Sequence, residues 1–440
     1  MLLPPDDRWT GFQKYFFRFF CCFFILYLFP FPLDQVPFVN EITAWKPKLT
    51  AWYSAIFEAY SNMWHSIVVW FAAHILHLKN PVTIFTNGSG DTTFDYIMLL
   101  INFLLALLAS ITWSVFDRKR SSYREAYYWI RVLVRYFLGM NMITYGMYKV
   151  LHLQMPFPYL SQLVQPFGDK SPMGLAWSFV GYSKAFSAFT GWGEVVGGLL
   201  LFFRKTTTLG ALLSAVVMGN IVAINFCYDV PVKLFSSALF LMCLFLLAPD
   251  ARRLLNVLWY NRPAEAANLE HALQKHWQRI TRLVLKWMFI LYTVYELLHT
   301  LTGYVKDYGD NRTLPTLYGI YNSTLFVKNH DTLPPLTTDT TRWKQLVIQF
   351  DKYAMVKTMD DSARNYNFEV DSAKRSISAW TNTDTLHKAH FVFKTDSTHL
   401  RLDGKWKDDS LHILFSKFDV RKFRLVNTGF RWINEYPFNR

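Results

Sequence analysis

The chain has 440 residues, of which 52% are hydrophobic and 18% are charged, whereas soluble domains average about 25% charged residues. This composition excludes a purely soluble globular protein and indicates a polytopic membrane protein with a soluble appendage. Of the net charge of +14, +5 lies on residues 305–440, and the remaining +9 collects in short loops between apolar runs. That placement is typical of membrane topology and contact with anionic lipid, not of nucleic-acid binding. The four cysteines lie in apolar segments without a Cys-x-x-Cys motif, which argues against a thiol-redox enzyme.

Apolar runs divide residues 1–304 into candidate spans, because about 20 apolar residues cross a bilayer as a helix. The first run resembles a signal sequence, but Phe29–Pro32 offers no small residues for cleavage, so we expect an uncleaved span. The predicted spans are 15–30, 94–116, 128–150, 191–203, 207–226, 232–249 and 282–303.

An eighth apolar segment, 50–78, has a helical pattern and is rich in Trp and His. Its sequence leaves open whether it spans the membrane. Lys14 and Arg18 favour an N-terminus inside the cell, and segment 50–78 must then lie in the interface or re-enter the membrane. We prefer this interpretation, since a spanning helix would place the N-terminus outside.

Cations in the connections predict the orientation of the helices, because cytoplasmic loops are enriched in Lys and Arg. We expect a bacterial inner-membrane protein whose residues 151–190 face outwards and whose C-terminal domain is periplasmic. Within 151–190, Ser171 and Pro172 predict the start of a helix that runs to Thr190 and lies along the membrane surface or caps a cavity. The cytoplasmic clusters are Arg118-Lys119-Arg120, Arg204-Lys205 and Arg252-Arg253.

The composition changes after Tyr304. Residues 305–340 are rich in Asn, Asp, Thr and Pro and are interpreted as a linker, whereas 341–440 alternate apolar and polar residues in short runs. We predict an external all-β antiparallel barrel or sandwich over 341–440. The predicted strands are 345–350, 365–370, 376–380, 390–394, 399–404, 411–418 and 423–426.

The predicted membrane part comprises N-terminal segments (1–130), a four-helix core (131–250), and a cytoplasmic loop with the last transmembrane helix (251–304).

Two charges within the predicted core are the first functional candidates, because a charge at membrane depth costs several kcal/mol and usually has a partner. Lys149 lies near the outer end of its span, where it either binds an anionic group, acts as a base, or reaches to the interface. Glu194 is expected to open its helix, with Gly197 and Gly198 permitting close helix packing. An ion pair between Lys149 and Glu194 is one hypothesis.

Further polar residues complete the candidate ligand pocket. Tyr145 lies one turn before Lys149. Asn225, Asp229 and Lys233 are spaced by four around a predicted turn, and form either a polar cluster or a local salt bridge. Glu296 and His299 form a Glu-x-x-His on one helix, which is a weak metal candidate because di-iron bundles need a second copy. We therefore assign no metal.

The motifs in 131–250 resemble those of the DoxX-like family of membrane proteins. The resemblance rests on Gly146-x-x-Lys149, on Glu194 followed by Gly-Gly-Leu, and on Thr-x-x-Gly-Ala at 207–211. It implies a four-helix core, which would lie within the seven or eight apolar segments of the chain, and a link to quinone-dependent redox assemblies. Tyr145, Gly146 and Lys149 are also similar, more weakly, to the horizontally transferred transmembrane domain of vitamin K-dependent carboxylases, in which a membrane Lys is the base on a reduced quinone.

These patterns lead to three hypotheses about function. The first is binding of a quinone or lipid at an outward-facing pocket that includes Lys149 and Glu194, within an envelope or redox assembly. The second is a membrane enzyme that uses quinol chemistry with Lys149 as base. The third is a structural membrane partner that docks an envelope protein through the β domain.

Overall fold

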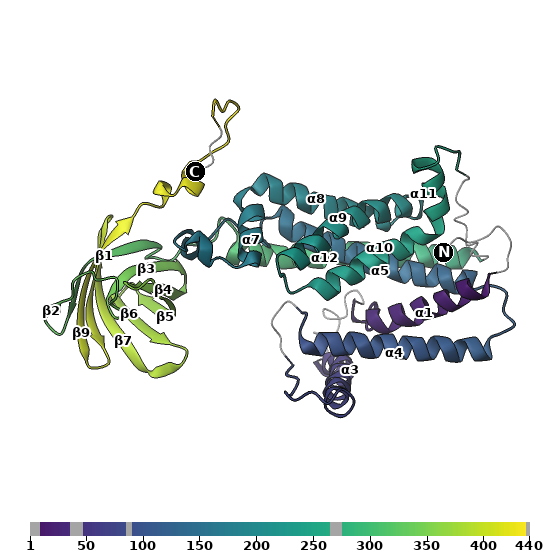
Figure 1. The fold of residues 1–440 in the computed structure, drawn as a ribbon, viewed down its shortest axis with the longest axis horizontal. Coiled ribbons are helices and arrows are strands. Elements are labelled where there is room, and N and C mark those ends of the chain that lie inside the picture. The colour runs from purple at the N-terminus through teal and green to yellow at the C-terminus, as the bar shows by residue number, and fades with distance from the viewer. Residues whose placement is uncertain (1–8, 36–46, 85–89, 265–274, 437–440) are drawn as a thin grey trace. The chain divides into compact units, whose positions relative to one another are not determined.

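The computed structural model describes residues 9–35, 47–84, 90–264 and 275–436. They divide into two compact units. The first contains residues up to Gln154 together with Ala185–Tyr304 and is built of helices (Figure 1). The second contains Met155–Lys184 and residues from Val305 onward and is built mainly of β-strands.

Two helices of the first unit begin at capping boxes in the sequence. A capping box at Thr10 and Gln13 starts the helix at Gly11, and another at Thr92 and Asp95 starts the helix at Thr93. The helices are α1 (Gly11–Leu28), α3 (Pro47–His74), α4 (Thr93–Phe116), α5 (Arg124–Val150), α8 (Lys184–Leu201), α9 (Thr207–Cys227), α10 (Lys233–Leu247), α11 (Ala251–Leu258) and α12 (His276–Tyr308), with 3-10 turns η1 (Leu33–Gln35), η3 (Arg204–Thr206) and η4 (Ala248–Asp250).

Four helical segments among the described residues are long and apolar enough to cross a membrane. The other long helices contain more polar residues; α5, for example, contains Arg131, Arg135 and Lys149. The structure thus agrees with a membrane protein, and the full count of seven or eight spans stays a prediction. The four segments are Gly11–Leu28, Thr93–Phe116, Arg204–Cys227 and Lys233–Leu258.

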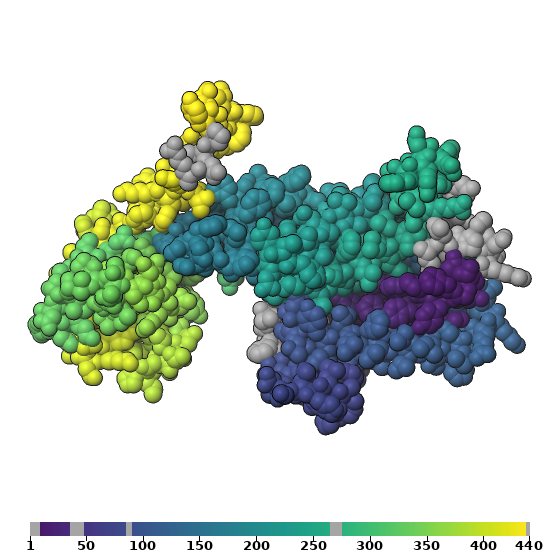
Figure 2. All heavy atoms as spheres, in the orientation of Figure 1, coloured from purple at the N-terminus to yellow at the C-terminus, as the bar shows by residue number. Residues whose placement is uncertain are grey.

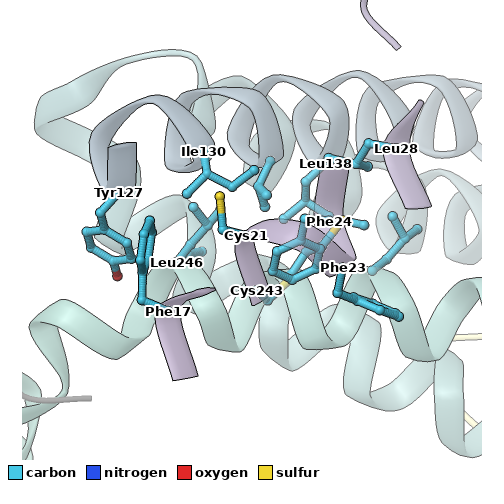
Figure 3. Packing of buried hydrophobic residues seen from close by; sticks show 14 of the residues in the cluster. Phe17, Cys21, Phe23, Phe24, Leu28, Tyr127, Ile130, Leu138, Cys243 and Leu246 are labelled. Atoms are coloured by element: carbon cyan, nitrogen blue, oxygen red, sulfur yellow. The ribbon is translucent and has the colours of Figure 1, made fainter. Parts of the chain in front are cut away.

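The core of the first unit is formed by apolar side chains of α1, α5 and α10. Aromatic rings of α1 and of the start of α5 pack in it among aliphatic side chains, and Phe24 is fully buried. Space-filling shows α1 lying along α4 on the surface of this unit (Figure 2). In the close view, the side chains of α1 pack against those of α5 and α10 (Figure 3), with Phe17, Cys21 and Phe24 near Ile130, Leu138, Cys243 and Leu246.

Segment 50–78 is helical as predicted, since α3 covers Pro47–His74. It packs against α4 through Trp64 and Val68, which contact Ile97 and Ile101. Figure 1 shows α3 nearly end-on while α4 lies along the page, so the two axes cross steeply. A helix so placed against a spanning α4 suits the interfacial interpretation. Whether it spans stays open.

The C-terminal domain is an antiparallel barrel, which decides between the predicted barrel and sandwich. Eight strands follow one another in chain order around the barrel. Strand β1 closes it by pairing with β9, from Ile320 opposite Phe418 to Lys328 opposite Leu411. The short β2 pairs with the end of β1. The strands are β1 (Gly319–Lys328), β2 (Asp331–Thr332), β3 (Trp343–Phe350), β4 (Lys352–Thr358), β5 (Ala363–Asp371), β6 (Ser376–Thr381), β7 (Asp384–Thr395), β8 (His399–Trp406) and β9 (Asp409–Phe418).

Side chains fill the interior of the barrel. Inward-facing residues alternate with outward-facing ones along each strand, as a pleated strand requires. Leu400, Leu402, Ile413 and Phe415 are completely buried there, beside Trp343. An eight-stranded barrel is just wide enough for side chains to fill it, so this interior forms a core.

Two sequence predictions in this domain need correction. Residues 305–340 are not all linker, because they include β1, the strand that closes the barrel. The predicted strand 423–426 is wrong. Asp419 caps the 3-10 turn η5 (Val420–Lys422), and a short helix α13 (Arg424–Asn427) follows. Local alternation of apolar residues cannot distinguish a final strand from a turn of helix.

The outward segment 151–190 also differs from expectation. Ser171 does cap a helix with Pro172 at its first position, but α7 (Pro172–Tyr182) stops at Ser183 and α8 begins anew. Residues 155–184 belong to the barrel unit instead of the helical core predicted for 131–250. The segment also contains α6 (Leu160–Leu163) and the 3-10 turn η2 (Phe167–Asp169).

Contacts with the outside of the barrel explain this assignment. Val347 points outwards, opposite to its inward-facing neighbours, and packs with Leu160 and Ile320. The backbone N–H of Ser161 donates to Gln349 Oε1, and Gln349 Nε2 donates to Ser161 Oγ, both at 3.0 Å. Apolar burial with two hydrogen bonds thus attaches α6 to β3.

Candidate functional site

Helices α5 and α8 cross closely at two pairs of glycines. A Cβ atom on Gly146 would lie 2.7 Å from the carbonyl oxygen of Gly191, and one on Gly198 would lie 2.8 Å from that of Gly139. Both pairs are seven residues apart on their helices and run in opposite order, so α5 and α8 are antiparallel. Small residues let helix backbones approach in this way inside a membrane.

Lys149 and Glu194 meet beside the Gly146–Gly191 crossing. Lys149 lies in the last turn of α5, and its Nζ forms a hydrogen-bonded ion pair with Glu194 Oε1. Side chains on a helix tilt toward its N-terminus. Lys149 therefore points back toward Gly146, and Glu194 points back toward Gly191. The hypothesis of an ion pair is confirmed.

The position of Glu194 corrects one prediction. Glu194 does not open its helix, because α8 begins at Lys184 and Glu194 lies in the middle of it. A helix N-terminus consequently does not stabilise its carboxylate, and Lys149 is the compensating charge. Snorkelling of Lys149 to the interface is likewise not observed, since its side chain is 9% exposed and that of Glu194 is 3% exposed.

The ion pair keeps unused hydrogen-bonding capacity. An ammonium group has three N–H donors and a carboxylate has about four acceptor sites. Among the described residues, Lys149 Nζ donates to Glu194, and nothing else occupies either head group. Tyr145 is close enough for its hydroxyl to interact electrostatically with Glu194 and is 40% exposed. Ser187 Oγ donates to the Lys149 carbonyl at 2.8 Å and holds α8 against the end of α5.

The remaining pocket candidates separate into two places. Asn225 is 4% exposed and its side-chain N–H donates to Ser236 Oγ at 3.0 Å, which joins α9 to α10. Asp229 and Lys233 form a local salt bridge at 2.7 Å, with the Asp229 side chain 82% exposed. The spacing by four thus produces a local salt bridge, one of the two alternatives, and not a shared polar cluster.

Sequence reasoning missed Asp91, which caps α10. Its carboxylate accepts hydrogen bonds from the backbone N–H groups of Lys233 at 2.6 Å and Leu234 at 2.9 Å. A carboxylate at a helix N-terminus accepts hydrogen bonds from the free N–H groups and interacts favourably with the helix dipole. No local signal links residue 91 to residue 233, so only the fold reveals this contact.

The weak metal candidate consists of Glu296 and His299 on α12. The His299 ring stacks on Tyr295, with ring centroids 6.2 Å apart, and its side chain is exposed. Among the described residues, no group of three or more His, Cys, Asp or Glu side chains could hold a metal ion. Glu296 and His299 therefore have no third ligand in the part of the chain that the structure describes.

A curated relative is recognisable from sequence. The protein YwoB of Bacillus subtilis (strain 168), itself described as uncharacterized, is 34% identical over 140 residues, which is 32% of this chain and 87% of YwoB. The chain belongs to the YwoB family. No family model matches it, and no solved structure matches it. This family membership concerns about a third of the chain and carries no activity with it.

This YwoB-family chain has a second polar network, which sequence reasoning missed. Arg18, interpreted above as a topology signal, is 5% exposed. Its guanidinium donates to the Tyr123 hydroxyl at 2.6 and 3.0 Å, to Ser114 Oγ at 2.8 Å and to the Asp117 carbonyl at 2.7 Å. The Tyr123 hydroxyl in turn donates to the Asp117 carboxylate at 2.8 Å. The network joins α1, α4 and the start of α5 and leaves little capacity for a ligand.

Proposed function

We propose that this protein binds the polar head of a membrane-soluble ligand, a quinone or lipid, at Lys149, Glu194 and Tyr145. The observation that carries the proposal is the buried ion pair with unused donors and acceptors beside a partly exposed tyrosine. A quinone carbonyl accepts hydrogen bonds from an ammonium, and a lipid hydroxyl or phosphate is suited to the same groups. The motifs shared with DoxX-like proteins support this class of ligand.

The proposed setting is the bacterial inner membrane, with the ligand site at the outer end of α5. The cations of the connections support this orientation through the positive-inside rule, and in this proposal the barrel is periplasmic. In this proposal the protein acts within an envelope or redox assembly.

The ion pair favours binding over the enzyme alternative. A lysine paired with a carboxylate carries its proton, and an ammonium has no lone pair with which to accept another. A catalytic base at Lys149 would need Glu194 to withdraw or to take the proton first. Ligand binding needs neither step.

The structural alternative rests on a separate observation at the C-terminus. Phe430 is 80% exposed, Trp432 is 91% exposed and Ile433 is 76% exposed. Exposed aromatic side chains are characteristic of protein–protein interfaces. In this alternative, the barrel docks an envelope protein through the segment that ends the described chain. Loss of a co-purifying protein on deletion of 424–440, with ligand content unchanged, would favour it.

Native mass spectrometry with lipid and quinone extraction tests the binding proposal. Lys149→Ala leaves a buried carboxylate unpaired, so the double variant Lys149→Met/Glu194→Gln serves as a folded comparison with both charges removed. Lys233→Met, in the exposed salt bridge with Asp229, is the matched control. We expect a stoichiometric quinone or lipid in the parent and in Lys233→Met, and its loss in the double variant. Equal ligand content in all three proteins would refute the proposal.

A further inference from the structure

A cluster of cations lies at the other end of α5, away from the proposed ligand site. Arg131 and Arg135 are one turn apart on α5, Arg204 lies in η3, and Arg282 and Lys286 are one turn apart on α12. The charges of Arg131 and Arg204 act on Arg135, and the charges of Arg135 and Arg282 act on Lys286. Five positive groups from three segments thus come together.

Aromatic rings hold these cations in place. The Arg204 guanidinium lies 5.2 Å from the centroid of the Tyr128 ring, and the Arg135 guanidinium lies 5.6 Å from that of Tyr136. Lys286 Nζ lies 4.1 Å from the Phe203 ring centroid. Cation–π contacts orient charged groups without neutralising them. The rings therefore position the cations without supplying a negative charge.

Four of these five cations have no ion pair with a carboxylate of the described residues. They are Arg131, Arg135, Arg282 and Lys286. The buried Asp250 is engaged elsewhere, with Arg253 at 2.5 Å and the Thr208 hydroxyl at 2.5 Å. Like charges brought this close repel one another, so an added negative charge would stabilise these four cations.

One of these cations is buried with an unused donor. Arg135 is 8% exposed, and its Nε has no hydrogen-bond acceptor. The buried Nε of Arg131 also has none. A buried polar group without a partner costs about 1–3 kcal/mol, and more when it is charged. An anion that accepts from Arg135 would remove this cost and the repulsion together.

We propose that Arg131, Arg135, Arg204, Arg282 and Lys286 form a binding site for the phosphate of an anionic ligand. Arginine forks fit phosphate oxygens, and lysine adds a point charge. Arg135 and Lys149 are 14 residues apart on α5, which places the two sites about 21 Å apart along the helix at 1.5 Å per residue. The site is thus separate from the proposed quinone or lipid site, and neither proposal depends on the other.

An anionic phospholipid headgroup is the source that the surroundings favour. On α12, Leu283 is 56% exposed, Leu285 is 53% exposed and Trp287 is 44% exposed. These apolar groups beside Arg282 and Lys286 offer a surface for acyl chains. Soluble phosphate has the same head-group chemistry without that apolar contact, so the two sources can be distinguished by experiment.

The test uses the full-length protein, stripped of lipid in detergent and titrated with phosphatidylglycerol, phosphatidylcholine or inorganic phosphate. Native mass spectrometry counts the bound lipid, and the melting temperature of the protein is measured at each ligand concentration. Arg282→Gln/Lys286→Gln changes residues of the cluster that are exposed or half-buried, so folding should survive. Arg252→Gln, an exposed cation on α11, is the control for net charge.

We expect phosphatidylglycerol to bind about tenfold more tightly than phosphatidylcholine, and the double variant to weaken it about tenfold. Arg252→Gln should change the affinity less than about twofold. Binding of inorganic phosphate that the double variant abolishes, with no preference between the two lipids, would support the site with a soluble phosphate as ligand. Equal binding of both lipids without phosphate binding, or equal effects of control and double variant, would overturn the proposal.

Arg135→Met provides a second readout. Removal of an uncompensated buried charge should raise the melting temperature of the lipid-free protein, because a buried charge without a partner opposes folding. The same variant should lose the stabilisation that phosphatidylglycerol gives the parent. A lower melting temperature in the lipid-free state would show that Arg135 is already compensated within the chain, and would also overturn the proposal.

Discussion

Lys149 and Glu194 form their ion pair where the backbones of α5 and α8 come closest, at Gly146 and Gly191. The two features depend on each other. The glycines bring the helices near enough for a lysine and a glutamate to meet without reaching the interface. The ion pair in turn adds a polar attraction between the two helices at this crossing.

Gly146→Ala should destabilise the helical unit. The new Cβ would lie 2.7 Å from the Gly191 carbonyl oxygen and 2.9 Å from the Val195 amide nitrogen, so α8 must move away. Overpacking of this kind costs about 1–3 kcal/mol. The free energy of unfolding in mixed micelles measures the loss.

Gly303→Ala is the matched control for that substitution. Gly303 also lies in a helix, and no atom lies within 4 Å of its added Cβ. Alanine should therefore stabilise the protein by about 0.5–1 kcal/mol, through helix propensity alone. A loss of stability at both glycines would contradict the close-packing explanation at Gly146.

Removing one member of the central ion pair should cost more than removing both. Lys149→Met leaves the Glu194 carboxylate buried without a partner, which costs about 3–5 kcal/mol. Lys149→Met/Glu194→Gln leaves no buried charge and should stay close to the parent in stability. Thermal melting of the three proteins at neutral pH measures the order.

Lys233→Met again serves as the control. Its partner Asp229 is exposed to solvent, and an exposed pair contributes about 0–1 kcal/mol. A double variant that is less stable than Lys149→Met would contradict the view that the two charges of the central pair mainly compensate each other.

Tyr123→Phe should weaken the connection between α1 and α4. The hydroxyl accepts two hydrogen bonds from Arg18 and donates one to Asp117. Its loss leaves a buried guanidinium with fewer acceptors, which we expect to cost about 1–3 kcal/mol. Tyr96→Phe on α4 is the control, because the Tyr96 side chain is 49% exposed. Equal melting temperatures for the two variants would contradict a structural role for the network.

Asp396 should make the β7–β8 turn sensitive to acid. The backbone N–H groups of Thr398 and His399, followed by the Thr398 hydroxyl, donate to its carboxylate and lower the pKa of Asp396 from 3.8 to about 2. Because the folded pKa is below the ordinary value, this contribution to stability is present above pH 3.8 and is lost as the pH falls toward 2.

The measurement compares Asp396→Asn with the parent. The parent should melt at a higher temperature at pH 7, and the difference should shrink between pH 4 and pH 2 as the parent carboxylate is protonated, at about the pKa values above. Asp351→Asn, in the β3–β4 turn, is the control, because its carboxylate accepts no hydrogen bond from the described residues. A difference at Asp396 that does not vary with pH would exclude the carboxylate as its source.

The classes of structure along the chain follow from local patterns in its amino-acid sequence. Runs of about 20 apolar residues predict membrane helices, and short alternating runs after Trp343 predict an antiparallel β domain; both follow from neighbouring residues. The same is true of the Ser171-Pro172 helix start. The sequence also indicates Lys149 and Glu194 as candidates, because a charge within an apolar run is costly at membrane depth.

Only the tertiary structure decided which of these residues meet. The partners in each key contact are far apart in sequence: Lys149 and Glu194 by 45 residues, Arg18 and Tyr123 by 105, and Asp91 and Leu234 by 143. The closure of the barrel by β1 and the attachment of α6 to β3 also join residues that are far apart in sequence. Local sequence patterns indicate the secondary structure and burial of a residue, whereas its contact partner depends on how helices and strands pack together.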